Sequence, residues 1–98
     1  LSKRFGYTIP IPEATLNAAA YQLLNQKKYA EAIKLFTQNT QNYPNSPNVY
    51  DSLGEAFEKN GKLKQAKENY KKGYDLAIKI GDRRSAALIK TNLDRVSR

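Results

Sequence analysis

Apolar residues recur along the chain at the spacing of one face of an α-helix. Leu16, Ala19, Ala20 and Leu23 stand at positions i, i+3, i+4 and i+7, and this spacing returns 34 residues later. The shift by 34 aligns seven apolar or small residues with seven others, namely Leu16, Ala19, Ala20, Leu23, Tyr29, Ala32 and Phe36 with Tyr50, Leu53, Gly54, Phe57, Leu63, Ala66 and Tyr70. The chain therefore contains two copies of a unit built from two helices.

The pattern predicts five helices, over residues 13–26, 29–42, 47–60, 63–80 and 83–97. Ser46 is expected to cap the third helix, with Pro47 at its first position, where a missing N–H costs nothing. Gly81 is expected to end the fourth helix, and Asp82 to cap the fifth. The fifth helix carries one apolar stripe, made of Ala86, Ile89, Leu93 and Val96.

Small residues occupy the positions at which two paired helices come closest, and these are Ala20, Ala32, Gly54 and Ala66. A glycine inside a helix costs about 1 kcal/mol relative to alanine. We therefore expect Gly54 to mark a tight contact between two helices.

The two units resemble the tetratricopeptide repeat, TPR. The second unit, residues 47–80, carries Tyr50-x2-Leu53-Gly54-x2-Phe57 followed by Ala66 and Tyr70. The first unit, residues 13–46, ends on Pro44 but departs from the family pattern at Lys27, where glycine is usual, and at Asn39, where alanine is usual. The second unit has Ile78 in the place of the closing proline, so its second helix is expected to continue to about Ile80.

The resemblance implies an all-α fold. Two helical hairpins and a C-terminal capping helix over residues 82–97 would stack as a short right-handed solenoid. Residues 1–12, with Pro10 and Pro12, are expected to form an extended linker ahead of this domain, which spans residues 13–98.

A narrower resemblance concerns the runs 43–56 and 90–96, which are similar to the C-terminal TPR tail of exported bacterial hydrolases of Bacteroidetes-type lineages. The run 3–13 resembles the linker that leaves the α/β-hydrolase domain in the esterase group. The resemblance implies a C-terminal appendage of a larger hydrolase, with a periplasmic or exported location. Because the chain begins with Leu1, we expect it to be a piece of a longer protein.

Composition excludes most catalytic chemistry. The 98 residues contain no cysteine and no histidine, so the usual nucleophile, general base and metal ligands are missing. The sequence has no Gly-x-Ser-x-Gly motif and no glycine-rich phosphate loop. We therefore expect a segment that is not an enzyme and binds no cofactor, metal or small-molecule substrate. No run of apolar residues approaches the length that a transmembrane helix needs.

In TPR arrays the first helix of each hairpin lines a concave groove, and the resemblance implies that a protein or peptide binds there. The candidate partner-binding residues are Asn17, Tyr21, Leu24, Asn48, Asp51, Ser52, Glu55 and Glu58. Three carboxylates without a facing arginine would repel an acidic tail and favour a basic or amide-rich partner, such as a segment of the chain's own N-terminal hydrolase domain. An alternative is that this segment shapes or regulates that domain in cis.

Two other interpretations of these residues stay open. Asp51, Glu55 and Glu58 lie at i, i+4 and i+7, so they could hold Mg²⁺ or Ca²⁺, or form a solvated face paired with Lys59 and Lys62. Tyr21 and Leu24 could be covered by the N-terminal residues Ile9 and Ile11, or simply be exposed.

The net charge of +8 comes entirely from one part of the chain. Residues 1–58 hold five basic and five acidic groups, whereas residues 59–98 hold twelve and four. Lys64, Lys67, Lys71 and Lys72 are expected on the outer side of the fourth helix. A solvated lysine-rich face is the favoured interpretation. Binding to nucleic acid or to an anionic envelope surface is the less favoured alternative.

Overall fold

In the computed structural model, which describes residues 11–98, the chain forms five α-helices. These are α1 (Glu13–Asn25), α2 (Tyr29–Asn42), α3 (Pro47–Lys59), α4 (Leu63–Ile80) and α5 (Arg83–Val96). The predicted helices are confirmed, with ends that differ by at most one residue. No helix in this part of the chain is both long and apolar enough to cross a bilayer.

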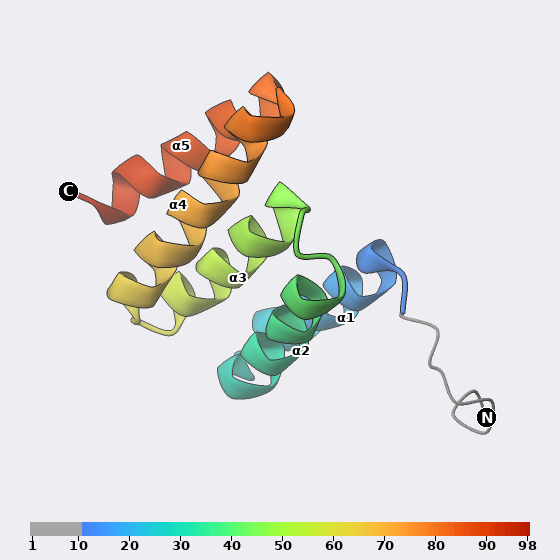
Figure 1. Ribbon diagram of the computed structural model, residues 1–98. Coiled ribbons are helices and arrows are strands. Elements are labelled where there is room, and N and C mark those ends of the chain that lie inside the picture. The colour runs from blue at the N-terminus through green and yellow to red at the C-terminus, as the bar shows by residue number, and fades with distance from the viewer. Residues whose placement is uncertain (1–10) are drawn as a thin grey trace.

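The helices stack as successive antiparallel neighbours, α1 on α2, α2 on α3, α3 on α4 and α4 on α5 (Figure 1). Helix α3 also contacts α1 and α5, whereas α2 and α4 do not contact each other. The odd-numbered helices therefore share one face of the molecule. This arrangement is an all-α helical-repeat solenoid, as the resemblance to the tetratricopeptide repeat implies.

Local chemistry explains most helix ends. Gly61 and Gly81 adopt left-handed φ angles of 76°, and Lys27 adopts 63° at the position equivalent to Gly61. The Asp82 carboxylate accepts a hydrogen bond from the Ser85 backbone N–H at 3.0 Å and so caps α5. Ser46 sits at the expected cap position of α3, but its side chain does not cap that helix. Its hydroxyl instead donates to Glu13 Oε2 at 2.9 Å and ties the start of α1 to the α2–α3 loop.

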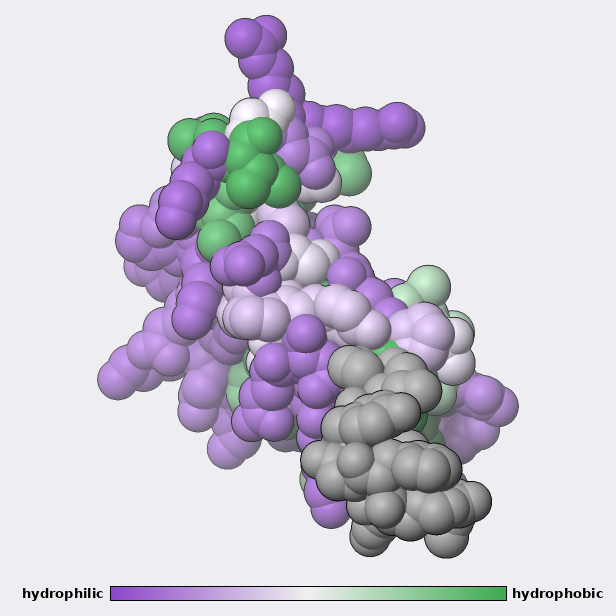
Figure 2. Space-filling view, turned by 45° about the vertical axis from the view of Figure 1, so that its right-hand side comes forward, coloured by the Kyte–Doolittle hydropathy of each residue, from purple (hydrophilic) through white to green (hydrophobic). Residues whose placement is uncertain are grey.

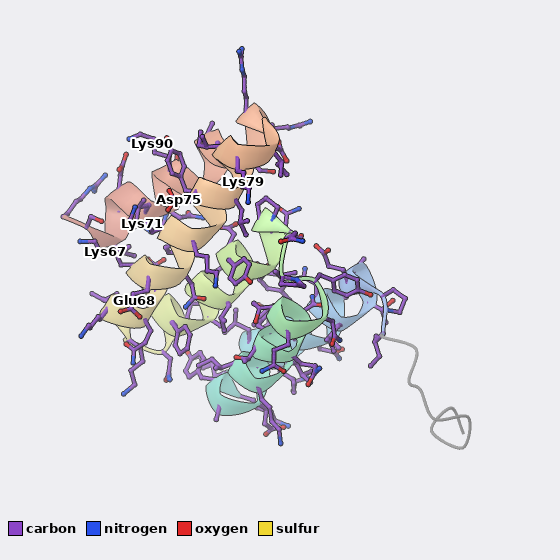
Figure 3. All side chains as sticks on the ribbon, in the orientation of Figure 1. Lys67, Glu68, Lys71, Asp75, Lys79 and Lys90 are labelled. Atoms are coloured by element: carbon purple, nitrogen blue, oxygen red, sulfur yellow. The ribbon has the colours of Figure 1, made fainter. Side chains whose placement is uncertain are left out.

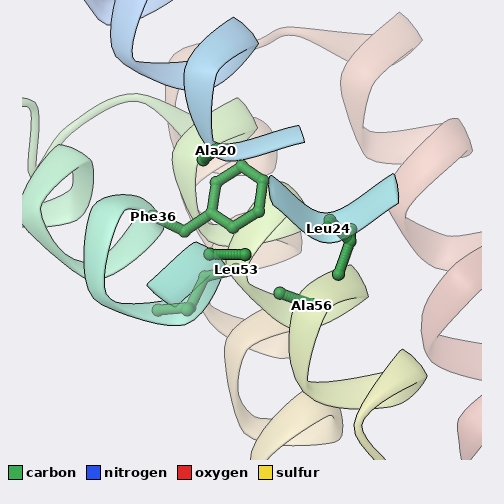
Figure 4. Packing of buried hydrophobic residues seen from close by; sticks show 6 residues of the cluster. Ala20, Leu24, Phe36, Leu53 and Ala56 are labelled. Atoms are coloured by element: carbon green, nitrogen blue, oxygen red, sulfur yellow. The ribbon is translucent and has the colours of Figure 1, made fainter. Parts of the chain in front are cut away.

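The first core cluster joins α1, α2 and α3 (Figure 4). Its buried members are Ala20, Leu24, Ala32, Phe36, Leu53 and Ala56. The expected apolar face of α1 is partly wrong, because Ala19 is exposed and Leu24 is buried in its place. Helix α1 packs against α3 as well as against α2, so its buried stripe turns toward α3.

The second core cluster joins α4 and α5 around Ala66, Tyr70 and Ile89. A Cβ added at Gly54 would lie 2.7 Å from the Tyr70 ring, so the expected tight contact at Gly54 is present. The pattern predicts that Leu63 is a core residue, and this prediction is wrong. Leu63 is the first residue of α4, at the edge of the molecule, and is 52% exposed.

Candidate functional site

The groove is built on one polar row of α3. Asn48, Asp51, Glu55 and Glu58 follow each other at intervals of three or four residues and therefore share a face of this helix, and Ser52 lies beside Asp51 at the edge of that face. Side chains of α1 reach this row from one side and side chains of α5 from the other. Helix α3 is thus the floor of the groove, and α1 and α5 are its walls.

Tyr21 connects the α1 wall to the floor. Its hydroxyl donates to Glu55 Oε1 at 2.7 Å and lies 3.2 Å from Ser52 Oγ. Burial raises the pKa of the Tyr21 hydroxyl, and the nearby Glu55 carboxylate raises this pKa further. The ring meets Phe36 edge-on, with 4.9 Å between the centroids. Tyr21 is therefore a neutral side chain with a fixed orientation, whose ring packs on the core and whose hydroxyl lies in the groove.

The α5 wall adds two residues that the sequence analysis did not identify. Asn92 Nδ2 donates to Asp51 Oδ1 at 2.8 Å, and Arg95 forms a bidentate pair with Glu58 at 2.8 and 2.7 Å. The expectation that the groove lacks a facing arginine is therefore wrong. Glu58 pairs with Arg95 rather than with Lys62, its expected partner.

The two carboxylates on the α5 side have opposite pKa shifts. Burial raises the pKa of Asp51, although the hydrogen bond from Asn92 partly offsets this effect. The hydrogen bonds from Arg95 lower the pKa of Glu58, and a further bond from the buried Tyr70 hydroxyl at 2.8 Å lowers it more. The negative charge of Glu58 is therefore stabilised by Arg95, whereas the negative charge of Asp51 is disfavoured by burial.

Two of the predicted groove residues, Leu24 and Ser52, are buried. Leu24 is 2% exposed and packs in the first core cluster. It cannot contact a partner without unfolding of α1. Asn17, Tyr21, Asn48, Asp51 and Ser52 do come together, at a hollow of about 400 Å³ between α1 and α3 that Glu13 and Ala14 also line.

A second hollow lies between α3 and α5 and has a different charge. It encloses about 450 Å³ and is lined by Glu55, Glu58, Lys59, Asn92 and Arg95, so two bases offset two acids. The hollow between α1 and α3 has two acids, Glu13 and Asp51, and no basic residue among its described lining. The groove thus has an acidic half and a neutral half.

The described residues offer no catalytic constellation. Ser52 is buried, and its recorded side-chain partner is Tyr21, which is held in the neutral form. Over residues 11–98 no group of three or more acidic side chains is placed to hold a metal ion.

The chain ahead of α1 is partly anchored. Tyr43 Oη donates to the carbonyl of Ile11 at 2.8 Å, which holds this residue against the α2–α3 loop. Ile11 itself remains half exposed. Ile9 and most of the expected linker lie outside the described residues.

The outer side of α4 carries Lys67, Glu68, Lys71, Asp75 and Lys79 (Figure 3). Lys71 pairs with Asp75 at 3.5 Å, and on α5 Lys90 pairs with Asp94 at 3.1 Å. These side chains are largely exposed, so each pair contributes little to stability. The face mixes both signs of charge.

Comparison with known proteins supports the fold. The chain matches no protein-family model, and no curated protein matches it. It resembles a tetratricopeptide repeat domain protein from Salinibacter ruber in a solution NMR structure, with 20% identity, a TM-score of 0.80, and coverage of 91% of this chain and 90% of that one. A crystal structure of a Salinibacter ruber tetratricopeptide repeat domain protein gives a TM-score of 0.76 at 20% identity, covering 88% and 97%. The chain therefore has the fold of a tetratricopeptide repeat domain.

Proposed function

We propose that this chain is a non-catalytic protein-interaction module whose groove binds an extended basic or amide-rich segment of a partner. The observation that carries the proposal is the acidic half of the groove. Glu13 and Asp51 line it, together with the amides of Asn17 and Asn48. Carboxylates attract lysine and arginine side chains, and amides can both donate to and accept from an extended backbone.

The Tyr21 ring supplies the apolar contact in this half of the groove. Leu24 does not contribute, because it is buried. Two hairpins and one further helix make a small surface, below the usual size of a stable interface. We therefore expect weak binding of a free peptide, and useful occupancy when the partner is tethered in the same chain.

The test compares short fluorescent peptides rich in lysine and arginine with peptides rich in glutamate. Glu13→Gln combined with Asp51→Asn removes both charges of the acidic half and keeps the shapes, and we expect it to weaken basic-peptide binding about tenfold. The matched control is Glu68→Gln with Asp75→Asn on the outer side of α4, which changes the net charge equally and should leave affinity unchanged. Stronger binding of the acidic peptides, or an equal loss in the control, would contradict the proposal.

A finer assignment rests on the resemblance of residues 43–56 and 90–96 to the TPR tail of exported hydrolases. In it, the groove docks the chain's own hydrolase domain or shapes that domain in cis. The experiment is hydrogen exchange on a longer chain that includes the upstream domain, compared with residues 11–98 alone. Added protection at the amides of residues 48–55 is expected, and identical exchange in the two proteins would reject docking at this groove.

A further inference from the structure

Helix α4 extends beyond the repeat pattern. It has 18 residues, whereas its counterpart α2 has 14, and Ile78 stands at the position equivalent to Pro44. A Cβ added at Gly73 would lie 3.0 Å from the Pro47 carbonyl oxygen, so the start of α3 lies beside Gly73. The seven residues that follow Gly73, up to Ile80, add roughly 10 Å of helix. Figure 1 shows the α4–α5 turn projecting past the start of α3.

The projecting end combines apolar and basic side chains. Ile78 and Ile80 are 55% and 56% exposed. Lys79 lies between them, and Arg83 and Arg84 follow after a two-residue turn. Figure 2 shows strongly apolar atoms at this end of the molecule, with hydrophilic side chains extending around them. We call residues 78–84 the tip.

The turn inside the tip holds a defined shape. Gly81, in the left-handed conformation, donates its N–H to the carbonyl of Ile78 at 3.1 Å, and Asp82 donates to Ala77 at 2.8 Å. This pair of bonds is the Schellman ending of a helix. Asp82 then caps α5 through Ser85. The isoleucines and arginines are therefore presented by an ordered turn between two helices.

The tip departs from what helix stability alone favours. Arg83 and Arg84 occupy the first turn of α5, where the helix dipole is positive and basic residues are unfavourable. Two large apolar side chains are left in solvent at the same place. Local departures of this kind are expected where a surface serves binding.

We propose that the tip inserts end-on into the interfacial region of an anionic lipid bilayer. Consecutive helical residues are about 100° apart, so Ile78 and Ile80 point about 160° away from each other around the axis. A flat protein surface would cover only one of them, whereas a bilayer interface surrounds an inserted end. Apolar insertion ringed by bases is also the chemistry that holds proteins at the surface of anionic membranes.

Nucleic acid is a poorer fit to the same residues. Phosphates would attract Lys79, Arg83 and Arg84 but would gain nothing from the exposed isoleucines. The tip shares no residue with the two hollows of the groove, so the proposal is independent of what the groove binds.

The experiment is co-sedimentation of the full chain with vesicles of phosphatidylcholine and phosphatidylglycerol in equal parts, compared with phosphatidylcholine alone. Binding is expected with the mixed vesicles and not with the neutral ones. Ile78→Ser combined with Ile80→Ser should lower the partition coefficient at least about tenfold, because two exposed apolar side chains lose their burial. The matched control is Leu63→Ser, which removes an equally exposed side chain at the other end of α4 and should leave binding unchanged.

A charge pair completes the design. Arg83→Glu with Arg84→Glu should abolish binding, whereas Lys64→Glu with Lys67→Glu changes net charge equally and should retain most of it. Circular dichroism checks that each variant is folded. The proposal is overturned if the chain does not bind the mixed vesicles, if either control variant behaves like its tip counterpart, or if duplex DNA binds with the same arginine dependence and outcompetes the vesicles.

Discussion

The two hairpins fill one equivalent contact with different chemistry. In the first hairpin, Phe36 is fully buried in an apolar cluster that includes Leu24. In the second, the residues 34 positions later are Tyr70 and Glu58, and the Tyr70 hydroxyl donates to Glu58 Oε1 at 2.8 Å. Glu58 also accepts two hydrogen bonds from Arg95. Phe36 therefore packs inside its apolar cluster, whereas Tyr70 is linked through the Glu58 carboxylate to Arg95 on the capping helix α5.

The difference shows how the last helix is positioned. An apolar contact of the first kind is non-directional and tolerates small shifts. The bidentate Arg95–Glu58 pair fixes both distance and angle, so α5 is held in register with α3. Because the Arg95 side chain is 44% exposed, we expect this pair to contribute geometry more than stability.

The largest expected effect on stability comes from Gly54, the small residue that packs against the Tyr70 ring. Ala20 in the first hairpin already accommodates a Cβ, but a Cβ at Gly54 would lie 2.7 Å from the Tyr70 ring. Gly54→Leu should therefore destabilise the domain by about 3 kcal/mol or more, measured as a lower urea midpoint. Lys67→Ala, on the exposed side of α4, should change stability by less than about 0.5 kcal/mol. Equal shifts from the two changes would contradict the packing described here.

The helices and the tight contact at Gly54 could be predicted from the sequence, because both depend on spacing within and between the repeats. The burial of Leu24 could not be predicted, because the spacing of apolar residues within one hairpin shows only which face of α1 packs on α2. Helix α1 also packs on α3, and that second contact buries Leu24. Arg95 lies 37 residues from Glu58, and no local spacing predicts a pair so distant in the chain.

Exchanging the two rings tests the comparison directly. Phe36→Tyr places a hydroxyl in the apolar cluster, where no carboxylate faces it, and should cost about 2 kcal/mol. Tyr70→Phe removes a donor to a charged acceptor and should cost about 1.5 kcal/mol, since Arg95 still holds Glu58. Urea unfolding measures both. If either exchange is neutral, the two contacts are not chemically distinct.

A smaller effect is expected at the turn inside each hairpin. Lys27 and Gly61 occupy equivalent positions with φ of 63° and 76°, a region that disfavours residues with a Cβ. Lys27→Gly relieves this strain, but a more flexible unfolded chain offsets part of the gain, so stability should rise by about 0.5 kcal/mol. The reverse change, Gly61→Lys, should lower stability by a similar amount. A loss of stability in Lys27→Gly would show that the lysine side chain makes a contact worth more than the strain.

The smallest effect concerns the pH dependence of the groove carboxylates, which are partly screened by solvent. Burial raises the pKa of Asp51 above its ordinary 3.8, so the folded state holds this proton more tightly, and stability falls as the pH rises through the folded-state pKa. Arg95 lowers the pKa of Glu58 below its ordinary 4.5, so the contribution of Glu58 to stability is present above that value and is lost as the pH falls through the folded-state pKa.

Asp51→Asn, which copies the amide that the first repeat has at Asn17, should raise the urea midpoint at neutral pH more than in acid. Glu58→Gln should lower the midpoint at neutral pH and flatten its decline in acid. Changes of the same sign in both variants would show that the two carboxylates do not have the opposite settings described here.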